Sequence, residues 1–126
     1  NIWLELTTLL IPGENDSSEE LRQMSKWIIE NLGDRVPIHF TAFHPDFKMR
    51  NIPPTPHKTL KVAREIALEA GMKYVYTGNV HDPEGQTTYC PGCGEKVIER
   101  NWHTVTNNRL INGVCPVCST KLDGIF

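Results

Sequence analysis

Apolar and polar positions in the first two thirds of the chain alternate between short hydrophobic runs and helical stripes. Residues 2–11, IWLELTTLLI, are apolar and β-branched without clean alternation, which is typical of a parallel strand covered on both faces. Apolar residues then recur at helical spacing over residues 21–32. Ser17 and Glu20 have the spacing of a capping box, and Gly33 is suited to a C-cap. The pattern therefore predicts a strand followed by a helix.

The same unit then repeats. Residues 37–43, PIHFTAF, predict a second strand, and an apolar stripe over residues 60–70 predicts a second helix. We expect Thr55 to cap this helix, with Pro56 at its first position. Residues 73–77, KYVYT, predict a third strand. The order β-α-β-α-β, with helices long enough for right-handed crossovers, indicates a parallel sheet.

Three parallel strands are few for a free-standing domain, because such sheets need cover on both faces and neighbours at both edges. Two helices connected with the same hand cover only one face. We therefore expect residues 1–77 to be a segment of a larger sheet or barrel, completed by further chain or by a partner. The chain begins with Asn1 rather than Met, so we expect a processed product, an expressed fragment or a part of something longer.

The last third of the chain has a different composition. Residues 78–85, GNVHDPEG, have the character of a linker-like turn, and residues 86–126 contain few aliphatic side chains. Hairpin-like stretches lie around residues 97–98 and 102–105. Two dipeptides, Asn107-Asn108 and Asn112-Gly113, are turn signals. The pattern predicts a small β-ribbon.

All four cysteines lie in this last third, in two C-x2-C turns with the sequences CPGCG and CPVCS. They are Cys90, Cys93, Cys115 and Cys118. We call each C-x2-C turn a knuckle, because it places two thiolates on one side of a tight loop. Two facing knuckles supply a closed tetrahedral site, which favours structural zinc. Rubredoxin-type iron is the alternative metal, and redox-active thiol pairs are a less favoured interpretation. The metal would fold a segment whose own core is too small.

Charge and hydropathy narrow the function classes. The formal net charge of −2 argues against a general polyanion binder. The chain has no secretory signal and no apolar run near its start that is long enough to cross a membrane. Cysteines confined to a metal motif are typical of a reducing compartment. We therefore expect a cytoplasmic protein.

Polar loops follow each of the three predicted strands. Parallel strands end on one side of the sheet, and ligand sites gather there. We predict that residues 12–16, 44–50 and 79–81 face one shared cavity. The candidate cofactor-binding residues are Pro12, Gly13, Asn15, Asp16, His44, Asp46, Lys48, Asn79 and His81. The alternatives are a helix cap for Asn15 and Asp16 and a solvated surface loop around His44, while His39 within the second strand is more often a packing residue.

Four stretches of the chain resemble one enzyme family. They are TTLLIPGENDSSEEL (7–21), HFTAFHPDFKMRNIPPTP (39–56), EAGMKYVYTGNV (69–80) and TTYCPGCGEKVIER (87–100). They resemble the C-terminal part of radical SAM proteins related to pyruvate formate-lyase activating enzyme, in the branch called AmmeMemoRadiSam system radical SAM enzyme. The resemblance implies that residues 1–85 are the last part of a parallel β/α barrel and that residues 86–126 are an appended zinc ribbon.

The family's defining Cx3Cx2C motif, which binds a [4Fe-4S] cluster and S-adenosylmethionine, is absent from this sequence. We therefore assign that cofactor pair to a longer parent only, expect no activity from this chain alone, and assign no catalytic residue. The resemblance implies as partners the rest of the barrel, or another chain covering the sheet edge, and a protein substrate. We expect no membrane partner.

A binding module for protein or nucleic acid is the alternative function. The residues that favour it are Arg100, Trp102, Arg109 and Lys121. Four scattered residues are a weak signal for nucleic-acid binding, so we disfavour a nucleic-acid partner.

Overall fold

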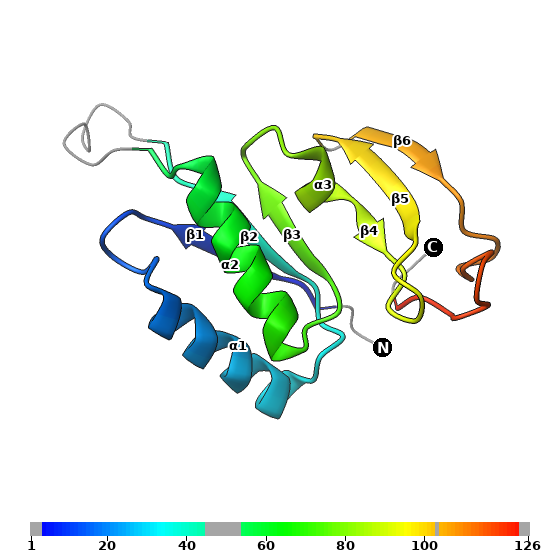
Figure 1. Cartoon of the computed structure of the whole chain (residues 1–126), viewed down its shortest axis with the longest axis horizontal. Helices are drawn as coiled ribbons and strands as arrows, with labels where there is room; N and C mark the ends of the chain where they lie inside the picture. Colours follow the sequence, from blue (N-terminus) through cyan, green and yellow to red (C-terminus); the bar gives the residue numbers. More distant parts are fainter. Residues whose placement is uncertain (1–3, 45–53, 103, 124–126) are drawn as a thin grey trace.

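The structure, a computed structural model, describes residues 4–44, 54–102 and 104–123 as two small sheets lying side by side (Figure 1). In chain order the elements are β1 Leu6–Leu10, α1 Ser18–Leu32, β2 Ile38–Ala42, α2 His57–Ala70, β3 Val75–Gly78, α3 Pro83–Gln86, β4 Thr88–Tyr89, β5 Lys96–Asn101 and β6 Thr104–Asn108. The expected β-α-β-α-β order of the first part is confirmed.

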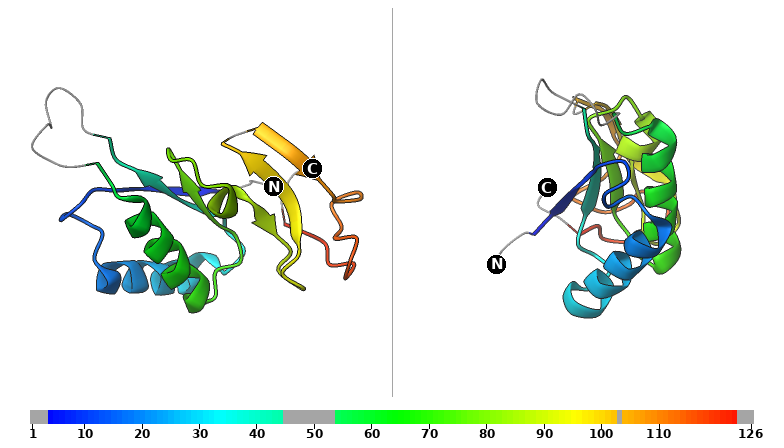
Figure 2. Two further views of the ribbon diagram at one scale, coloured as in Figure 1. Left: turned by 45° about the horizontal axis from the view of Figure 1, so that its top comes forward. Right: turned by 90° about the vertical axis from the view of Figure 1, so that its left-hand side faces the viewer.

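The first sheet is parallel, in the order β1-β2-β3. Both long helices cover the same face of this sheet (Figure 2), as the two crossovers require. The core between them contains Leu10, Phe40 and Leu60, all fully buried. The mixed α/β class and the one-sided helical cover agree with the sequence-based expectation.

Within the described residues β1 is covered on one face only, so cover of its second face by further chain or by a partner stays a prediction. Leu10 is buried, but the side chain of Leu9 is 44% exposed. β2 alternates in the same way, because Phe40 is buried while His39 and Thr41 are only partly so. Threonines and leucines occur on both faces of β1, and this mixture hides the period of two that distinguishes the faces. The second face of the sheet is largely polar.

The boundaries of α1 follow the predicted chemistry. The Ser17 hydroxyl oxygen accepts the Glu20 backbone N–H at 3.2 Å, and this hydroxyl donates to the Glu20 carboxylate at 3.2 Å. At the other end Gly33 has φ of 93° and its N–H bonds to the carbonyls of Ile28 and Ile29. The Ser17 N-cap and the glycine C-cap are confirmed, whereas Glu20 contacts the Ser17 hydroxyl in place of the Ser17 N–H that a full capping box would use.

Thr55 does not cap α2, so that prediction is wrong. The N-cap is Pro56, without a side-chain hydrogen bond. The buried Thr55 hydroxyl instead accepts the Phe43 N–H at 2.7 Å and donates to the Leu10 carbonyl at 2.5 Å. These two backbone groups lie just where β1 and β2 end, and buried groups of this kind need partners. Thr55 therefore joins two strand ends.

The second sheet is antiparallel, in the order β4-β5-β6. The predicted hairpin is confirmed, but its turn is near Trp102, which has φ of 57°. Asn107 and Asn108 lie within β6, so their assignment to a turn is wrong, and Asn107 instead donates to the Glu99 carboxylate across the hairpin at 3.1 Å. Asn112 and Gly113 do form a turn, with φ of 52° and 76°, between the bridged residues Ile111 and Val114.

The segment expected to be a linker contains α3, which spans the boundary predicted between residues 85 and 86. Asp82, just before this helix, accepts from the Thr77 hydroxyl at 2.8 Å. A Cβ on Gly85 would lie 2.3 Å from both the Asp82 carboxylate and the Thr77 hydroxyl. Close packing of α3 on β3 therefore requires glycine at this position.

A second hydrophobic core joins the two sheets. Tyr74, which precedes β3, is buried with Val97, Ile98 and Leu122 of the ribbon and with two of the cysteines. The Tyr74 hydroxyl donates to the Asp123 carboxylate at 2.9 Å and accepts the Asp123 N–H at 3.0 Å. Arg35 pairs with the same carboxylate at 2.6 Å. The ribbon is therefore packed and hydrogen-bonded to the parallel sheet.

Candidate functional site

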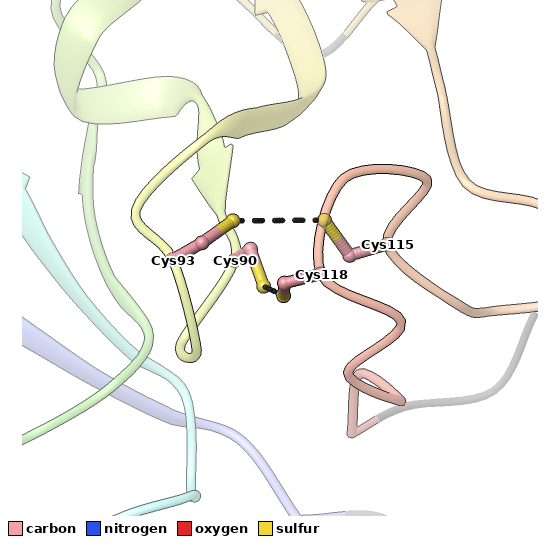
Figure 3. Close-up of side chains that lie close together, drawn as sticks. All are labelled: Cys90, Cys93, Cys115 and Cys118. Atoms are coloured by element: carbon pink, nitrogen blue, oxygen red, sulfur yellow. Dashed lines mark hydrogen bonds between the residues drawn. The ribbon is translucent and has the colours of Figure 1, made fainter.

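The four cysteine side chains point toward one another from two facing knuckles (Figure 3). All four Sγ atoms lie within 4.8 Å of one another. Cys90 and Cys118 have their sulfurs 3.4 Å apart, and Cys93 and Cys115 have theirs 3.8 Å apart. A tetrahedral zinc ion with Zn–S bonds of about 2.3 Å has sulfurs about 3.8 Å apart. The sulfur positions therefore fit one tetrahedral metal ion.

The two knuckles repeat the same backbone hydrogen bonds. In the first, the Cys90 N–H donates to the Glu95 carbonyl at 2.8 Å, and the Cys90 carbonyl accepts the Gly94 N–H at 2.9 Å. In the second, the matching bonds join Cys115 with Thr120 at 2.9 Å and Ser119 with Cys115 at 3.0 Å. Gly94 and Ser119 are equivalent, and both have left-handed backbone, with φ of 79° and 63°. Each knuckle is thus a tight turn that needs a positive φ after its second cysteine.

Close approach of the knuckles depends on Gly92. A Cβ at this position would lie 2.3 Å from the Thr120 hydroxyl oxygen and 3.3 Å from Cys118 Sγ. The Gly92 N–H also donates to Cys90 Sγ at 3.3 Å. Val117 occupies the equivalent position in the second knuckle, where its side chain is 57% exposed. The first knuckle is therefore the one that leaves room for its partner.

The surroundings of the thiols shift their pKa values in different directions. The Thr120 hydroxyl, 3.1 Å from Cys118 Sγ, and the Thr120 amide lower the pKa of Cys118 to about 6. The amides of Cys118 and Val117 lower the pKa of Cys115. The Glu95 amide favours the Cys93 thiolate, but desolvation and the other three thiols outweigh it and raise the pKa of Cys93 to about 12. Four thiolates this close need a cation to lose all their protons together.

The cluster is closed, with Cys90 and Cys115 buried and Cys93 and Cys118 at the surface. Four sulfur donors fill all positions of a tetrahedral ion, so such a metal is structural rather than catalytic. The sequence predicted these four ligands, and the structure positions them to bind one metal ion.

The polar loops after the parallel strands lie at one edge of the sheet. His44 Nε2 is 2.9 Å from the Asn79 carbonyl oxygen, and the Asn79 side-chain amide donates to the Ala42 carbonyl at 3.0 Å. The loop after β2 therefore contacts the loop after β3. Asp46, Lys48 and Arg50 lie outside the described residues.

In the loop after β1, the polar side chains form hydrogen bonds with the loop's own backbone and with the end of β1. Asn15 donates to the Leu9 carbonyl at 2.8 Å and accepts the Ile11 N–H at 2.8 Å. Asp16 accepts the N–H of Gly13, which follows Pro12, at 3.1 Å. The N-cap of α1 is Ser17, so the alternative that Asn15 or Asp16 caps this helix is wrong.

His81, the last of the predicted loop residues, turns toward the ribbon. Its ring stacks on Trp102 with centroids 5.6 Å apart, and its Nε2 is 2.9 Å from the Asn101 side-chain oxygen. Of the predicted cofactor-binding residues that are described, only Asn79 lines the large groove considered next. The cavity shared by all three loops stays a prediction.

A groove of about 680 Å³ runs along the polar face of the parallel sheet, with β4 and β5 on its other side. Sequence reasoning did not assign Glu5, Tyr76 or Thr88 to a site and treated His39 as a packing residue. The signal for His39 and Tyr76 was the alternation of β2 and β3, in which every second residue is polar or half-buried. That alternation marks the face opposite the helices.

A continuous polar row crosses the groove. Glu5 Oε1 is 2.9 Å from His39 Nε2, and the His39 ring stacks on Tyr76 with centroids 5.1 Å apart. The Tyr76 hydroxyl is 2.8 Å from the Thr88 hydroxyl, which also accepts from Arg100 at 2.8 Å. Burial raises the pKa of Tyr76, against the opposing effects of Thr88 and Arg100. The phenol is therefore a neutral hydrogen-bonding group at physiological pH.

Comparison with known proteins gives one relative. An uncharacterized protein of Methanocaldococcus jannaschii is 43% identical to this chain over 127 residues, which cover 97% of the chain and 37% of the relative. The chain thus spans little more than a third of that relative's length. No family profile and no solved structure matches this chain. Among the described residues, none of the helices has the length and hydropathy needed to traverse a bilayer.

Proposed function

We propose that residues 86–126 form a zinc ribbon whose ion is held by Cys90, Cys93, Cys115 and Cys118. The observation that carries this proposal is the convergence of the four Sγ atoms to within 4.8 Å. Zinc is the usual occupant of closed four-thiolate sites, and iron is the alternative. The ion is structural, because no ligand position is left for a substrate.

The ion's role is to hold the ribbon against the parallel sheet. Cys90 and Cys115 are buried beside Tyr74, in the core that joins the two sheets. Binding of an ion to all four thiolates fixes both knuckles and therefore the position of this core. It also fixes β5, which forms one side of the groove.

Elemental analysis of the purified chain tests this proposal. We expect one zinc per chain and no visible absorption, because zinc is a d10 ion without redox chemistry. Cys93→Ser should lose the metal and unfold β5 and β6, whereas Val117→Ser, an exposed non-ligand change in the same site, should keep it. Iron with visible absorption would replace zinc in the proposal. A metal-free chain with a folded ribbon would refute it.

We further propose that this chain is the C-terminal part of a radical SAM protein related to pyruvate formate-lyase activating enzyme. The sequence resemblance supports it, as does helical cover on one face of the parallel sheet. The chain's match to only 37% of its archaeal relative also agrees with a longer parent. In that parent the missing strands of a β/α barrel would cover β1, and S-adenosylmethionine and a [4Fe-4S] cluster would bind outside this chain.

Anaerobic cluster reconstitution tests this assignment. We expect the 126-residue chain to assemble no [4Fe-4S] cluster and to form no 5′-deoxyadenosine from S-adenosylmethionine. A longer parent with an upstream Cx3Cx2C motif should do both, and serine variants of that motif should lose both. A parent lacking the motif would refute the assignment while leaving the zinc proposal unaffected.

A protein-binding ribbon is the second candidate. The exposed apolar side chains of Val105, Ile111 and Val117, each more than half exposed, favour a protein partner. Arg109 pairs with Glu95 at 3.5 Å and Arg100 faces the groove, so the two arginines do not form a common basic patch. Nucleic-acid affinity that falls steeply with salt would contradict this preference.

A further inference from the structure

We propose that the groove between the two sheets binds a small organic anion, a carboxylate or a phosphate ester, through the guanidinium of Arg100. Nothing in the metal site or the parent assignment requires this binding. The inference rests on the proposed zinc ribbon in one respect, because β5 of that ribbon carries Arg100.

Arg100 is held in place but lacks a counter-ion. Its Nη1 donates to the Gln86 carbonyl at 3.0 Å and to the Thr88 hydroxyl at 2.8 Å. Within the part of the chain that the structure describes, no carboxylate pairs with it, and the Tyr76 hydroxyl is a further hydrogen-bonding neighbour of its guanidinium. The side chain is partly buried and lines the groove. A fixed guanidinium fork that faces a cavity is suited to bidentate binding of a carboxylate or phosphate.

The surroundings of Arg100 favour an organic ligand over a bare ion. The guanidinium carbon lies 5.7 Å from the centre of the Tyr76 ring, and Trp102 also lines the groove. These rings provide apolar surface for the body of a ligand. Hydroxyl and amide groups of Thr7, Thr41 and Asn79 line the same space. Its volume of about 680 Å³ lies within the range of small-molecule sites.

The charges along the groove also orient the ligand. Glu5 and His39 form a hydrogen-bonded pair beyond Tyr76, at the opposite end of the polar row from Arg100. The ligand's anionic group therefore faces Arg100, and its neutral or hydrogen-donating end faces Glu5. Asp123 also lines the groove, paired with Arg35. The carboxylates of Glu5 and Asp123 both line the groove and would repel a long polyanion, so the ligand is a small anion.

Titration of the isotope-labelled, zinc-loaded chain followed by NMR tests the proposal. The probes are benzoate and phenyl phosphate, with neutral benzamide as the matched uncharged control. We expect both anions to shift amides of β3 and β5 at the groove, and benzamide to bind about tenfold more weakly or worse, because a charge-assisted hydrogen bond is lost. The ratio of the two anion affinities identifies the preferred headgroup.

Variants separate the guanidinium from general charge. Arg100→Gln should weaken anion binding by about tenfold or more, and Arg100→Lys should lie between it and the unchanged chain, because the charge remains without the planar fork. Arg109→Gln removes an arginine from the same ribbon outside the groove and should leave affinity unchanged. Equal binding of benzamide and benzoate, or full affinity in Arg100→Gln, would overturn the proposal.

Zinc content is measured in every sample, so the two proposals fail separately. Absence of anion binding in a zinc-loaded, folded chain counts against the groove site alone. A chain that takes up no zinc but keeps β5 folded counts against the zinc proposal, and its anion titration still decides the groove, whereas a zinc-free chain with β5 unfolded counts against both proposals. Arg100→Gln could fail the test by unfolding β4 and β5. In that case either of two other results still refutes the role of Arg100. One is unchanged affinity in Arg100→Lys, and the other is benzamide binding as tight as benzoate binding.

Discussion

At the scale of single residues, the two knuckles place different residue types, a glycine and a serine, at equivalent positions with positive φ. Gly94 and Ser119 have the same position in their knuckles and the same sign of φ. Glycine adopts this conformation without a Cβ penalty, whereas serine does not. The second knuckle is therefore the more strained of the two.

We predict that Ser119→Gly raises the stability of the zinc-loaded ribbon by about 0.5–1 kcal/mol, because relief of left-handed strain exceeds the entropic cost of glycine. Gly94→Ala should lower it by about 1 kcal/mol or more. Denaturant unfolding at fixed free zinc measures both. The reverse order of the two variants would show that the positive φ angles do not limit stability.

The thiols give a prediction for the ribbon immediately after rapid chelation, before the loss of zinc unfolds it. With the pKa of Cys118 lowered to about 6 and that of Cys93 raised to about 12, iodoacetamide at pH 7 should alkylate Cys118 early and Cys93 last. Peptide mapping by mass spectrometry measures the order. Thr120→Val should slow alkylation of Cys118 by raising its pKa. Zinc should protect all four, and equal rates immediately after chelation, while the ribbon is still folded, would contradict the assignment.

At the scale of elements, sequence reasoning succeeded where a local rule determines the structure. The N-cap at Ser17 and the turn at Asn112 depend on neighbouring residues only, and both are present. Thr55 was assigned wrongly because its partners, Leu10 and Phe43, are distant in sequence or belong to another element. Threonine is a good helix cap by local rules, and the needs of two strand ends override that preference.

We predict that Thr55→Val destabilises the parallel sheet by about 1–3 kcal/mol, because the Leu10 carbonyl and the Phe43 amide are left without a partner in a buried site. The exposed Thr106→Val in β6 serves as the matched control and should change stability far less. Chemical denaturation followed by circular dichroism measures both. A cost for Thr55→Val no larger than that of the control would refute the bridging role.

At the scale of the whole molecule, the two sheets are coupled through Tyr74. The sequence predicted the metal ligands from spacing, but it carried no sign that Tyr74 packs into the ribbon, because its partners Val97 and Leu122 follow far along the chain. The groove was missed for the same reason. Its two sides come from separate sheets, and only their relative placement brings His39 and Arg100 into one space.

We predict that zinc removal unfolds the ribbon and also releases the contacts of Tyr74 with Asp123 and of Asp123 with Arg35. Amide exchange should rise throughout β5 and β6, change locally around Tyr74 and remain slow in β2. The Val117→Ser chain without chelator should keep its zinc and its slow exchange, and it serves as the control. Unchanged exchange around Tyr74 would show that the two cores fold independently.

Because the two knuckles differ in backbone strain and in loop length, they should bind and release zinc in a fixed order. The first knuckle carries Gly92 and Gly94 and directly joins β4 to β5, whereas the second must be brought across a long loop and adopt its turn with Ser119 in a strained angle. Closing such a loop carries an entropic cost that the first knuckle does not bear. We therefore expect zinc to bind Cys90 and Cys93 first, and to dissociate first from Cys115 and Cys118. Rates of zinc transfer to a chelator should accordingly be slower in Ser119→Gly, while the rate of initial capture stays the same.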